Sequence, residues 1–186
     1  MTDHQQLPEG LPAPEDDGGA AHLTGFRLPS VALPSTAGRI VDLSTLSGRW
    51  VVYAYPRTGE PGKDSPPGWN EIPGARGCTP QSCSFRDHHA ELAALGAGVF
   101  GLSTQSSAYQ REAVERLHLP FEILSDEEFR LTEALGLPTF ETSGMRLLKR
   151  LTLILDDGQV TKVFYPVFPP DRSAEDVLEW LRAHPA

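Results

Sequence analysis

Blocks of apolar residues predict buried strands that alternate with amphipathic helices. The run 50–55 is rich in β-branched and aromatic residues, which is typical of a central strand, and 98–102 repeats this pattern. Between them, residues 85–95 carry apolar side chains at helical spacing and end at a glycine. The elements predicted after these are a helix at 107–117, a strand at 121–124, a helix from 125 to 136, strands at 147–155 and 159–165, and a helix that opens at Ser173.

Turn residues indicate how the last strands pair. Asp157-Gly158 predicts a two-residue hairpin turn, because both central positions of such a turn need a positive φ. Strands linked by helical crossovers, followed by this hairpin and a final helix, predict an α/β fold of the thioredoxin-like type, with a mixed central sheet flanked by helices. A short strand predicted at 38–43 adds an N-terminal β extension.

Two segments lack such a pattern. Residues 1–24 combine Pro, Gly and acidic residues without hydrophobic periodicity, which predicts a flexible tail before a single domain at 25–186. Residues 57–77 contain so many Gly and Pro residues that regular structure is excluded, and loops of this length are usually functional or disordered. Trp69 indicates that this loop packs on the domain, either covering a core edge or shaping the mouth of an active site.

Composition narrows the classes of function. Of the 186 residues, 39% are hydrophobic and 22% are charged, and no apolar run reaches the ~20 residues needed to span a bilayer. The net charge of -9 would repel the phosphates of a nucleic acid. The N-terminal residues lack the basic and apolar regions of a secretion signal. We therefore expect a cytoplasmic protein that binds neither nucleic acid nor a membrane.

The two cysteines of the chain, Cys78 and Cys83, lie at the predicted start of a helix. They are too few for a disulfide scaffold or a four-cysteine zinc site, and a close pair in a reducing cytosol favours redox chemistry. Pro80 predicts Thr79 as the N-cap, which puts Cys78 beside free backbone amides and the positive end of the helix dipole. Both favour a thiolate, so Cys78 is the candidate nucleophile.

The spacing of the cysteines has a geometric consequence. If both are helical, their α-carbons lie roughly 8–9 Å apart, whereas a disulfide needs roughly 4.4–6.8 Å. A bridge between Cys78 and Cys83 therefore requires the helix start to unwind. This suggests a cycle in which Cys78 is oxidised to a sulfenic acid that Cys83 then attacks. The alternative is a buried, inert Cys83 and an unrelated, exposed Cys78.

Five separated motifs are distributed along about 25–183. They are Val51-Val52-Tyr53-Ala54-Tyr55-Pro56, Gly77-Cys78-Thr79-Pro80-Gln81-Ser82-Cys83 with Phe85-Arg86-Asp87, Gly101-Leu102-Ser103-Thr104, Leu124-Ser125-Asp126, and Lys149-Arg150-Leu151-Thr152-Leu153-Ile154-Leu155. In this order they resemble the peroxiredoxins, and within them the Q-type branch, also called bacterioferritin-comigratory proteins. Five motifs in order are far more specific than one cysteine.

The resemblance implies a thiol-dependent peroxidase that reduces hydrogen peroxide or organic hydroperoxides. Cys78 would be the peroxidatic cysteine, Cys83 the resolving cysteine of the same chain, and Arg150 the cation beside the sulfur. Thioredoxin or a similar dithiol would reduce the resulting disulfide, and no metal or organic cofactor is implied. Because the resolving cysteine lies on the same chain, we expect a monomer.

One part of the family's pattern is missing. The family usually has a Pro seven residues and a Thr or Ser three residues before the reactive cysteine, and here these positions hold Glu71 and Ala75. Pro56-Arg57-Thr58 begins as the family's motif does, so 57–77 looks like an insertion that splits it. We hypothesise that Thr58 folds back to supply the missing hydroxyl.

Two other functions stay open at this point. A thiol-disulfide oxidoreductase would use the same pair, although such enzymes normally contain Cys-x-x-Cys. A non-catalytic redox sensor or binding protein would use the disulfide to change a partner surface.

Two other groups of polar residues are not expected to bind a metal. His88 and His89 would point about 100° apart on a helix and are not expected to share a metal. The acidic residues 126–128 are expected to be first-turn charges on a helix dipole.

Overall fold

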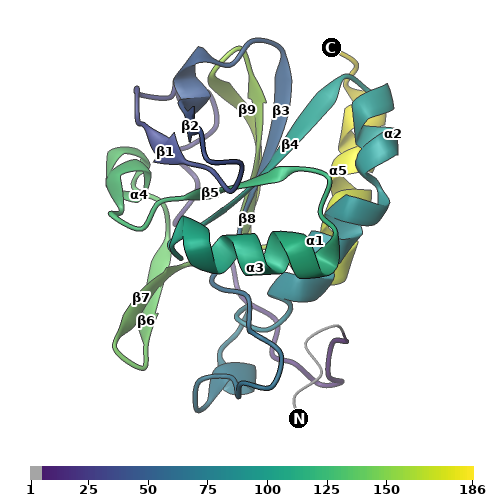
Figure 1. Cartoon of the computed structure of the whole chain (residues 1–186). Helices are drawn as coiled ribbons and strands as arrows, with labels where there is room; N and C mark the ends of the chain where they lie inside the picture. The colour runs from purple at the N-terminus through teal and green to yellow at the C-terminus, as the bar shows by residue number, and fades with distance from the viewer. Residues whose placement is uncertain (1–5) are drawn as a thin grey trace.

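A five-stranded mixed sheet forms the centre of the protein, in a computed structural model that describes residues 6–186 (Figure 1). The strand order is β5-β4-β3-β8-β9, with β3 parallel to β4 and antiparallel to β8. The strands of this sheet are β3 (Arg49–Ala54), β4 (Ala97–Ser103), β5 (Glu122–Ser125), β8 (Leu151–Asp156) and β9 (Gln159–Phe164). The predicted mixed sheet flanked by helices is confirmed.

The two faces of the sheet are covered differently. Along β3, Val51 and Tyr53 face a core shared with α1, α2, α3 and α5, whereas Val52 and Ala54 face a core shared with α4 and the N-terminal segment. This alternation follows from the two-residue period of a strand. The helices are α1 (Cys78–Asp87), α2 (His89–Ala94), α3 (Ser107–Leu117), α4 (Arg130–Leu135) and α5 (Ser173–Ala183).

Two short hairpins form two-stranded sheets of their own beside the five-stranded sheet. The expected N-terminal β extension is the pair β1 (Leu33–Pro34) and β2 (Ile40–Val41). The turn between β8 and β9 is the predicted one, with positive φ at Asp157 and Gly158. The single strand predicted at 147–155 is divided at residues 149–150 between β7 (Met145–Leu148) and β8. β7 pairs with β6 (Thr139–Thr142) in a hairpin that was not predicted, because its strands are mostly half-exposed.

One of the predicted helices is interrupted in the structure. The helix expected to run from the two cysteines to about residue 95 is two helices, because the chain breaks at His88 between α1 and α2. The helix expected at 107–117 is α3, and its N-cap Ser106 accepts a hydrogen bond from the backbone amide of Tyr109 at 3.3 Å. Local sequence signals thus located α3 with its ends but did not show the break at His88.

The N-terminal segment differs from the expected tail over the part that the structure describes. Leu23 is fully buried in the core on the α4 side of the sheet. Asp17 accepts hydrogen bonds from Lys149 at 2.6 Å and from the Tyr165 hydroxyl at 2.7 Å. These partners lie more than a hundred residues away, so local composition carried no sign of them. Residues 1–5 lie outside the described residues.

No helix within residues 6–186 combines the length and apolar character needed to cross a membrane.

Candidate active site

Gly77 determines where α1 begins. It is the N-cap residue, with a φ of 109°, and a side chain on it would collide with the ring of Pro170. Both constraints favour glycine, which has no Cβ and tolerates this conformation. The predicted N-cap at Thr79 is therefore wrong, because the N-cap is Gly77 and the helix starts at Cys78, two residues before Pro80. Cys78 lies in the first turn, where backbone amides have no partner within the helix.

Arg150 lies against the sulfur of Cys78. It is 3% exposed, and its Nη2 donates to Cys78 Sγ at 3.2 Å. The same nitrogen donates to the carbonyls of Ala75 at 3.1 Å and Arg76 at 3.3 Å, and Nη1 donates to Gln81 Oε1. A guanidinium presents its donors in a rigid plane, so these acceptors hold its charge in one place. Cys78 and Arg150, both expected at the site, are thus brought together.

A small pocket of about 90 Å³ opens over Cys78. Its walls come from the start of α1, the segment 57–77 and one residue of α3. The lining residues are Arg57, Gly59, Glu60, Lys63, Asp64, Ser65, Pro66, Trp69, Arg76, Gly77, Cys78, Thr79 and Tyr109. Cys78 is only 4% exposed, so little of its side chain is accessible from this pocket.

Cys83 lies on the same helix in a different environment. It is half-buried at the edge of the core on the α1 side of the sheet, and both cysteines are free thiols. Burial raises the pKa of the Cys83 thiol, and the nearby guanidinium of Arg86 partly opposes this rise. Because α1 includes both cysteines, their α-carbons are roughly 8–9 Å apart by helix geometry, and a bridge requires the first turns to open.

Two contacts between the cysteines anchor the helix start to the rest of the molecule. The Tyr53 hydroxyl donates to Ser82 Oγ at 3.0 Å, and the Tyr53 ring stacks on Phe85 with centroids 4.4 Å apart. Gln81 donates through Nε2 to Ser173 Oγ at 3.1 Å. Opening the first turns of α1 disrupts the side-chain contacts of Gln81 and Ser82, whereas Phe85 lies beyond both cysteines.

A family model described as Redoxin matches residues 23–178. The chain belongs to the redoxin family. Within that family, the chain is similar to the peroxiredoxins. Peroxiredoxin Bcp of Escherichia coli is 30% identical to it over 161 residues. This alignment covers 84% of the chain and 93% of the Escherichia coli protein.

Further relatives support the Q-type branch. The chloroplastic peroxiredoxin Q of rice, Oryza sativa subsp. japonica, is 33% identical over 163 residues, or 86% of this chain. The chain spans 66% of the length of that rice protein. Among solved structures, peroxidoxin BcpB from Mycobacterium tuberculosis is 28% identical, with a TM-score of 0.71 over 89% of this chain and 100% of that one. The resemblance to Q-type peroxiredoxins and the thioredoxin-like fold are confirmed.

Ala75 lies three residues before Cys78, where the family usually has a Thr or Ser hydroxyl. Its side chain is buried with Trp69 and Leu147 in a small apolar cluster outside the main core. Its carbonyl accepts from Arg150 and also from the Cys78 thiol, with a Cys78 Sγ to oxygen distance of 3.7 Å. Ala75 therefore contributes to the site through its backbone, and the insertion packs through Trp69 while also lining the pocket.

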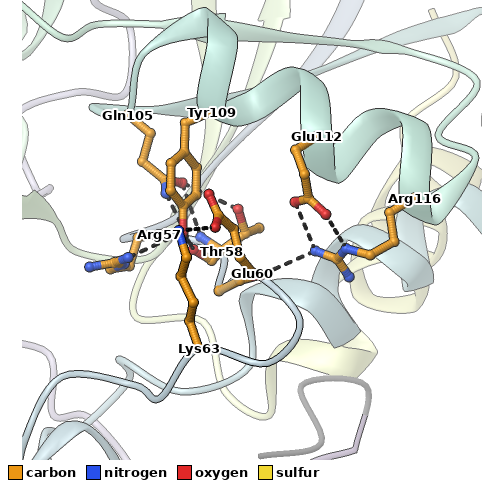
Figure 2. Close-up of polar contacts among 9 residues, drawn as sticks. Arg57, Thr58, Glu60, Lys63, Gln105, Tyr109, Glu112 and Arg116 are labelled. Carbon is orange, nitrogen blue, oxygen red and sulfur yellow. Dashed lines mark hydrogen bonds and ion pairs between the residues drawn. The ribbon is translucent and has the colours of Figure 1, made fainter.

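Thr58 is held by α3 and the residues just before it (Figure 2). Its amide donates to Gln105 Oε1 at 3.0 Å, and its carbonyl accepts from Gln105 Nε2 at 3.3 Å and from the Tyr109 hydroxyl at 3.2 Å. Its own hydroxyl lies 3.4 Å from Gln105 Oε1. Among the described residues, the structure gives no hydrogen bond between Thr58 and Cys78.

The two histidines have separate surroundings. His88 Nδ1 lies 2.7 Å from Glu91 Oε1, and the His89 ring packs 5.9 Å from that of Phe121. Residues 6–186 contain no group of three or more His, Cys, Asp or Glu side chains placed to hold a metal ion.

The acidic residues 126–128 precede α4, which begins at Arg130, so they are not the expected first-turn charges and the helix is shorter than the predicted 125–136. The Asp126 carboxylate still accepts from the amides of Leu131 at 3.0 Å and Thr132 at 2.7 Å at the start of that helix.

Sequence reasoning missed Gln81 and Tyr109 as parts of the site. Gln81 is completely buried and accepts from Arg150, and its position three residues after Cys78 places both on one helix face. Tyr109 lines the pocket from α3, far from Cys78 in sequence. A buried glutamine one turn after a reactive cysteine is a signal available in the sequence, whereas the role of Tyr109 depends on tertiary packing.

Proposed function

We propose that this redoxin is a thiol-dependent peroxidase that reduces hydrogen peroxide or organic hydroperoxides through Cys78. The observation that carries the proposal is the Arg150 guanidinium 3.2 Å from the Sγ of Cys78, a residue that lines a small pocket. A fixed positive charge at this place stabilises negative charge on the sulfur and on the peroxide oxygens as their bond breaks.

In the first step, the Cys78 thiolate attacks the proximal oxygen of the peroxide. The O–O bond breaks, the sulfur is oxidised to a sulfenic acid, and the leaving oxygen takes a proton to become water or an alcohol. Arg150 remains charged throughout, because a guanidinium is not deprotonated in proteins. Its role is electrostatic, and the proton comes from the peroxide or from solvent.

In the second step, the Cys83 sulfur attacks the sulfenic sulfur of Cys78. An S–S bond forms and water leaves, which conserves the two-electron oxidation as a disulfide. The two side chains meet only after the first turns of α1 open, so the contacts of Gln81 and Ser82 must break. Thioredoxin or a similar dithiol then returns both cysteines to thiols.

The proposed cycle uses one chain, since both cysteines lie on α1. We therefore propose a cytoplasmic monomer whose partners are a peroxide substrate and a dithiol reductant.

The hydroxyl that orients the peroxide is a separate hypothesis. Thr58 lies at the start of the insertion, and its hydroxyl must turn away from Gln105 Oε1 to reach a peroxide at Cys78. If Thr58 supplies this hydrogen bond, Thr58→Val lowers kcat/KM for hydrogen peroxide, and Thr58→Ser restores most of it. An unchanged kcat/KM in Thr58→Val would eliminate this role.

The reaction itself is tested by mixing reduced protein with one equivalent of hydrogen peroxide. Thiol loss and intact mass are followed in the wild type, Cys78→Ser and Cys83→Ser. We expect fast thiol loss that depends on Cys78, and a sulfenic or over-oxidised Cys78 when Cys83 is absent. Peroxidase activity retained in Cys78→Ser would refute the proposal. Slow peroxide consumption in the wild type, with a large oxidation-dependent change in partner binding, would instead indicate a redox sensor.

A further inference from the structure

Arg57 brings an additional positive charge to the pocket over Cys78. It is half-buried and lines the pocket together with Cys78 and Tyr109. Its guanidinium donates to the Tyr109 hydroxyl at 3.2 Å and to Met145 Sδ at 3.3 Å. Among residues 6–186, it has no carboxylate partner within 4.0 Å. Both hydrogen-bond partners are uncharged, so the positive charge of Arg57 is not neutralised by an ion pair.

Other charged groups around this pocket are arranged differently. Glu60 forms an ion pair with Lys63 on the rim, and Asp64 is exposed to solvent. Arg57 thus differs from Lys63 in having only uncharged hydrogen-bond partners among the described residues. A guanidinium without an ion-pair partner in a small pocket attracts small anions to one place, although the whole chain carries a net charge of -9.

The position of Arg57 is fixed by a set of polar contacts from α3 (Figure 2). The guanidinium carbon lies 5.8 Å from the centroid of the Tyr109 ring, and the Tyr109 hydroxyl donates to the carbonyl of Thr58. Arg116 donates to the carbonyl of Gly59 at 3.1 Å. The chain on the C-terminal side of Arg57 is thus tied to α3, and a fixed guanidinium loses little freedom when it binds an anion.

The size of the pocket restricts what can bind. Its volume of about 90 Å³ is well below the roughly 300 Å³ at which pockets for drug-sized ligands begin. A ligand that reaches Cys78 and also contacts Arg57 must therefore have only a few heavy atoms, with its reactive group and its charge close together.

We propose that Arg57 is a specificity-determining residue that binds the carboxylate of a small hydroperoxy acid while its peroxide group reacts at Cys78. This inference rests on the proposed peroxidase function and defines its substrate class. The chemical step is the one described above: the sulfur is oxidised to a sulfenic acid, and the substrate leaves as the corresponding hydroxy acid. Arg150 serves the peroxide group and Arg57 serves the carboxylate.

The first test does not depend on peroxidase activity. Cys78 is alkylated in a Cys83→Ser background with iodoacetate or iodoacetamide, which differ in charge but hardly in size. We expect Arg57→Gln to lower the ratio of the iodoacetate rate to the iodoacetamide rate roughly 3- to 10-fold, as loss of one partly screened charge pair would. Arg57→Lys should retain most of the preference, and added salt should weaken it.

Arg111→Gln is the matched control, because it removes the same charge from an exposed position on α3 outside the pocket. A ratio that stays at the wild-type value in Arg57→Gln would overturn the inference. An equal loss of both rates would also overturn it, because Arg57 would then only hold Tyr109 and Met145 in place.

The second test uses turnover of two hydroperoxides of matched shape. They are tert-butyl hydroperoxide and 2-hydroperoxy-2-methylpropanoate, in which a carboxylate replaces one methyl group. We expect Arg57→Gln to lower kcat/KM for the charged substrate roughly 3- to 10-fold relative to the neutral one. Equal effects on both substrates would contradict the inference while leaving the peroxidase reaction itself intact. Absence of turnover with any peroxide, together with a normal alkylation preference, would refute the peroxidase and retain only an anion site at Arg57.

Discussion

The two sides of the reactive cysteine are built from different kinds of structure. On one side, Arg150 precedes β8 and donates to Gln81 of α1 and to the carbonyls of Ala75 and Arg76, where the segment 57–77 ends. On the other side, the rest of the segment 57–77 has little regular structure, and its start is held to α3 by polar side chains (Figure 2). The comparison indicates a division of work within the proposed site, in which the sheet side places a guanidinium at the sulfur and the rest of the inserted segment forms a wall of the pocket.

The largest effect is expected on the sheet side. Arg150→Gln removes the charge beside Cys78 Sγ while retaining a polar side chain, and we expect kcat/KM for hydrogen peroxide to fall about 100- to 1000-fold. Stopped-flow measurement of peroxide consumption tests this. Arg146→Gln is the control, since this arginine pairs with Glu133 at the protein surface. A kcat/KM for hydrogen peroxide in Arg150→Gln close to that of the wild type would show that the positive charge of Arg150 does not assist the reaction at Cys78.

A smaller effect is expected from the packing of the inserted segment. Trp69 is 5% exposed and packs with Ala75 and Leu147 in a small cluster, so Trp69→Ala should lower the free energy of unfolding by about 1–3 kcal/mol. Urea unfolding measures this change. The peroxide rate should fall far less than in Arg150→Gln. A loss of rate as large as that of Arg150→Gln would refute the division of work between the two sides.

The smallest effect concerns the N-terminal segment that braces the sheet side. Hydrogen bonds from Lys149 and Tyr165 hold the pKa of Asp17 well below its usual range. A depressed pKa stabilises the fold above the unfolded-state pKa of about 3.9, and this contribution is lost as the pH falls through the folded-state pKa.

Asp17→Asn should therefore lower the free energy of unfolding by less than about 1 kcal/mol at neutral pH, because this carboxylate is 46% exposed. The difference from the wild type should shrink at about pH 3, where the carboxylate of the unfolded chain is protonated. Urea unfolding at both pH values provides the measurement. The same difference at both would show that Asp17 acts through something other than its charge.

Much of the central sheet was predictable, because buried strands consist of runs of apolar residues that are visible in the sequence. The continuous apolar run at 50–55 matched β3 closely, since a strand covered on both faces has no polar alternation. Cys78 and Arg150 were both identified before their contact was known, one from helix-start signals and both from family motifs.

The rest depended on contacts between distant parts of the chain. The start of α1 is set by Gly77 against Pro170, and Asp17 meets Lys149 across most of the sequence. The place of Thr58 beside Gln105 follows from how α3 packs, which no local pattern specifies. Sequence patterns located most of the elements, whereas some of their ends and the walls of the pocket were decided by tertiary structure.

The most direct test of the account is to map the oxidised cysteines after one equivalent of peroxide. The protein is oxidised, digested without reduction and analysed by mass spectrometry, with the chain's oligomeric state checked under the same conditions. We predict a single disulfide between Cys78 and Cys83 within one chain, with neither thiol open to alkylation. A disulfide between two chains, or a Cys83 that remains a free thiol while Cys78 is oxidised, would contradict the proposed cycle.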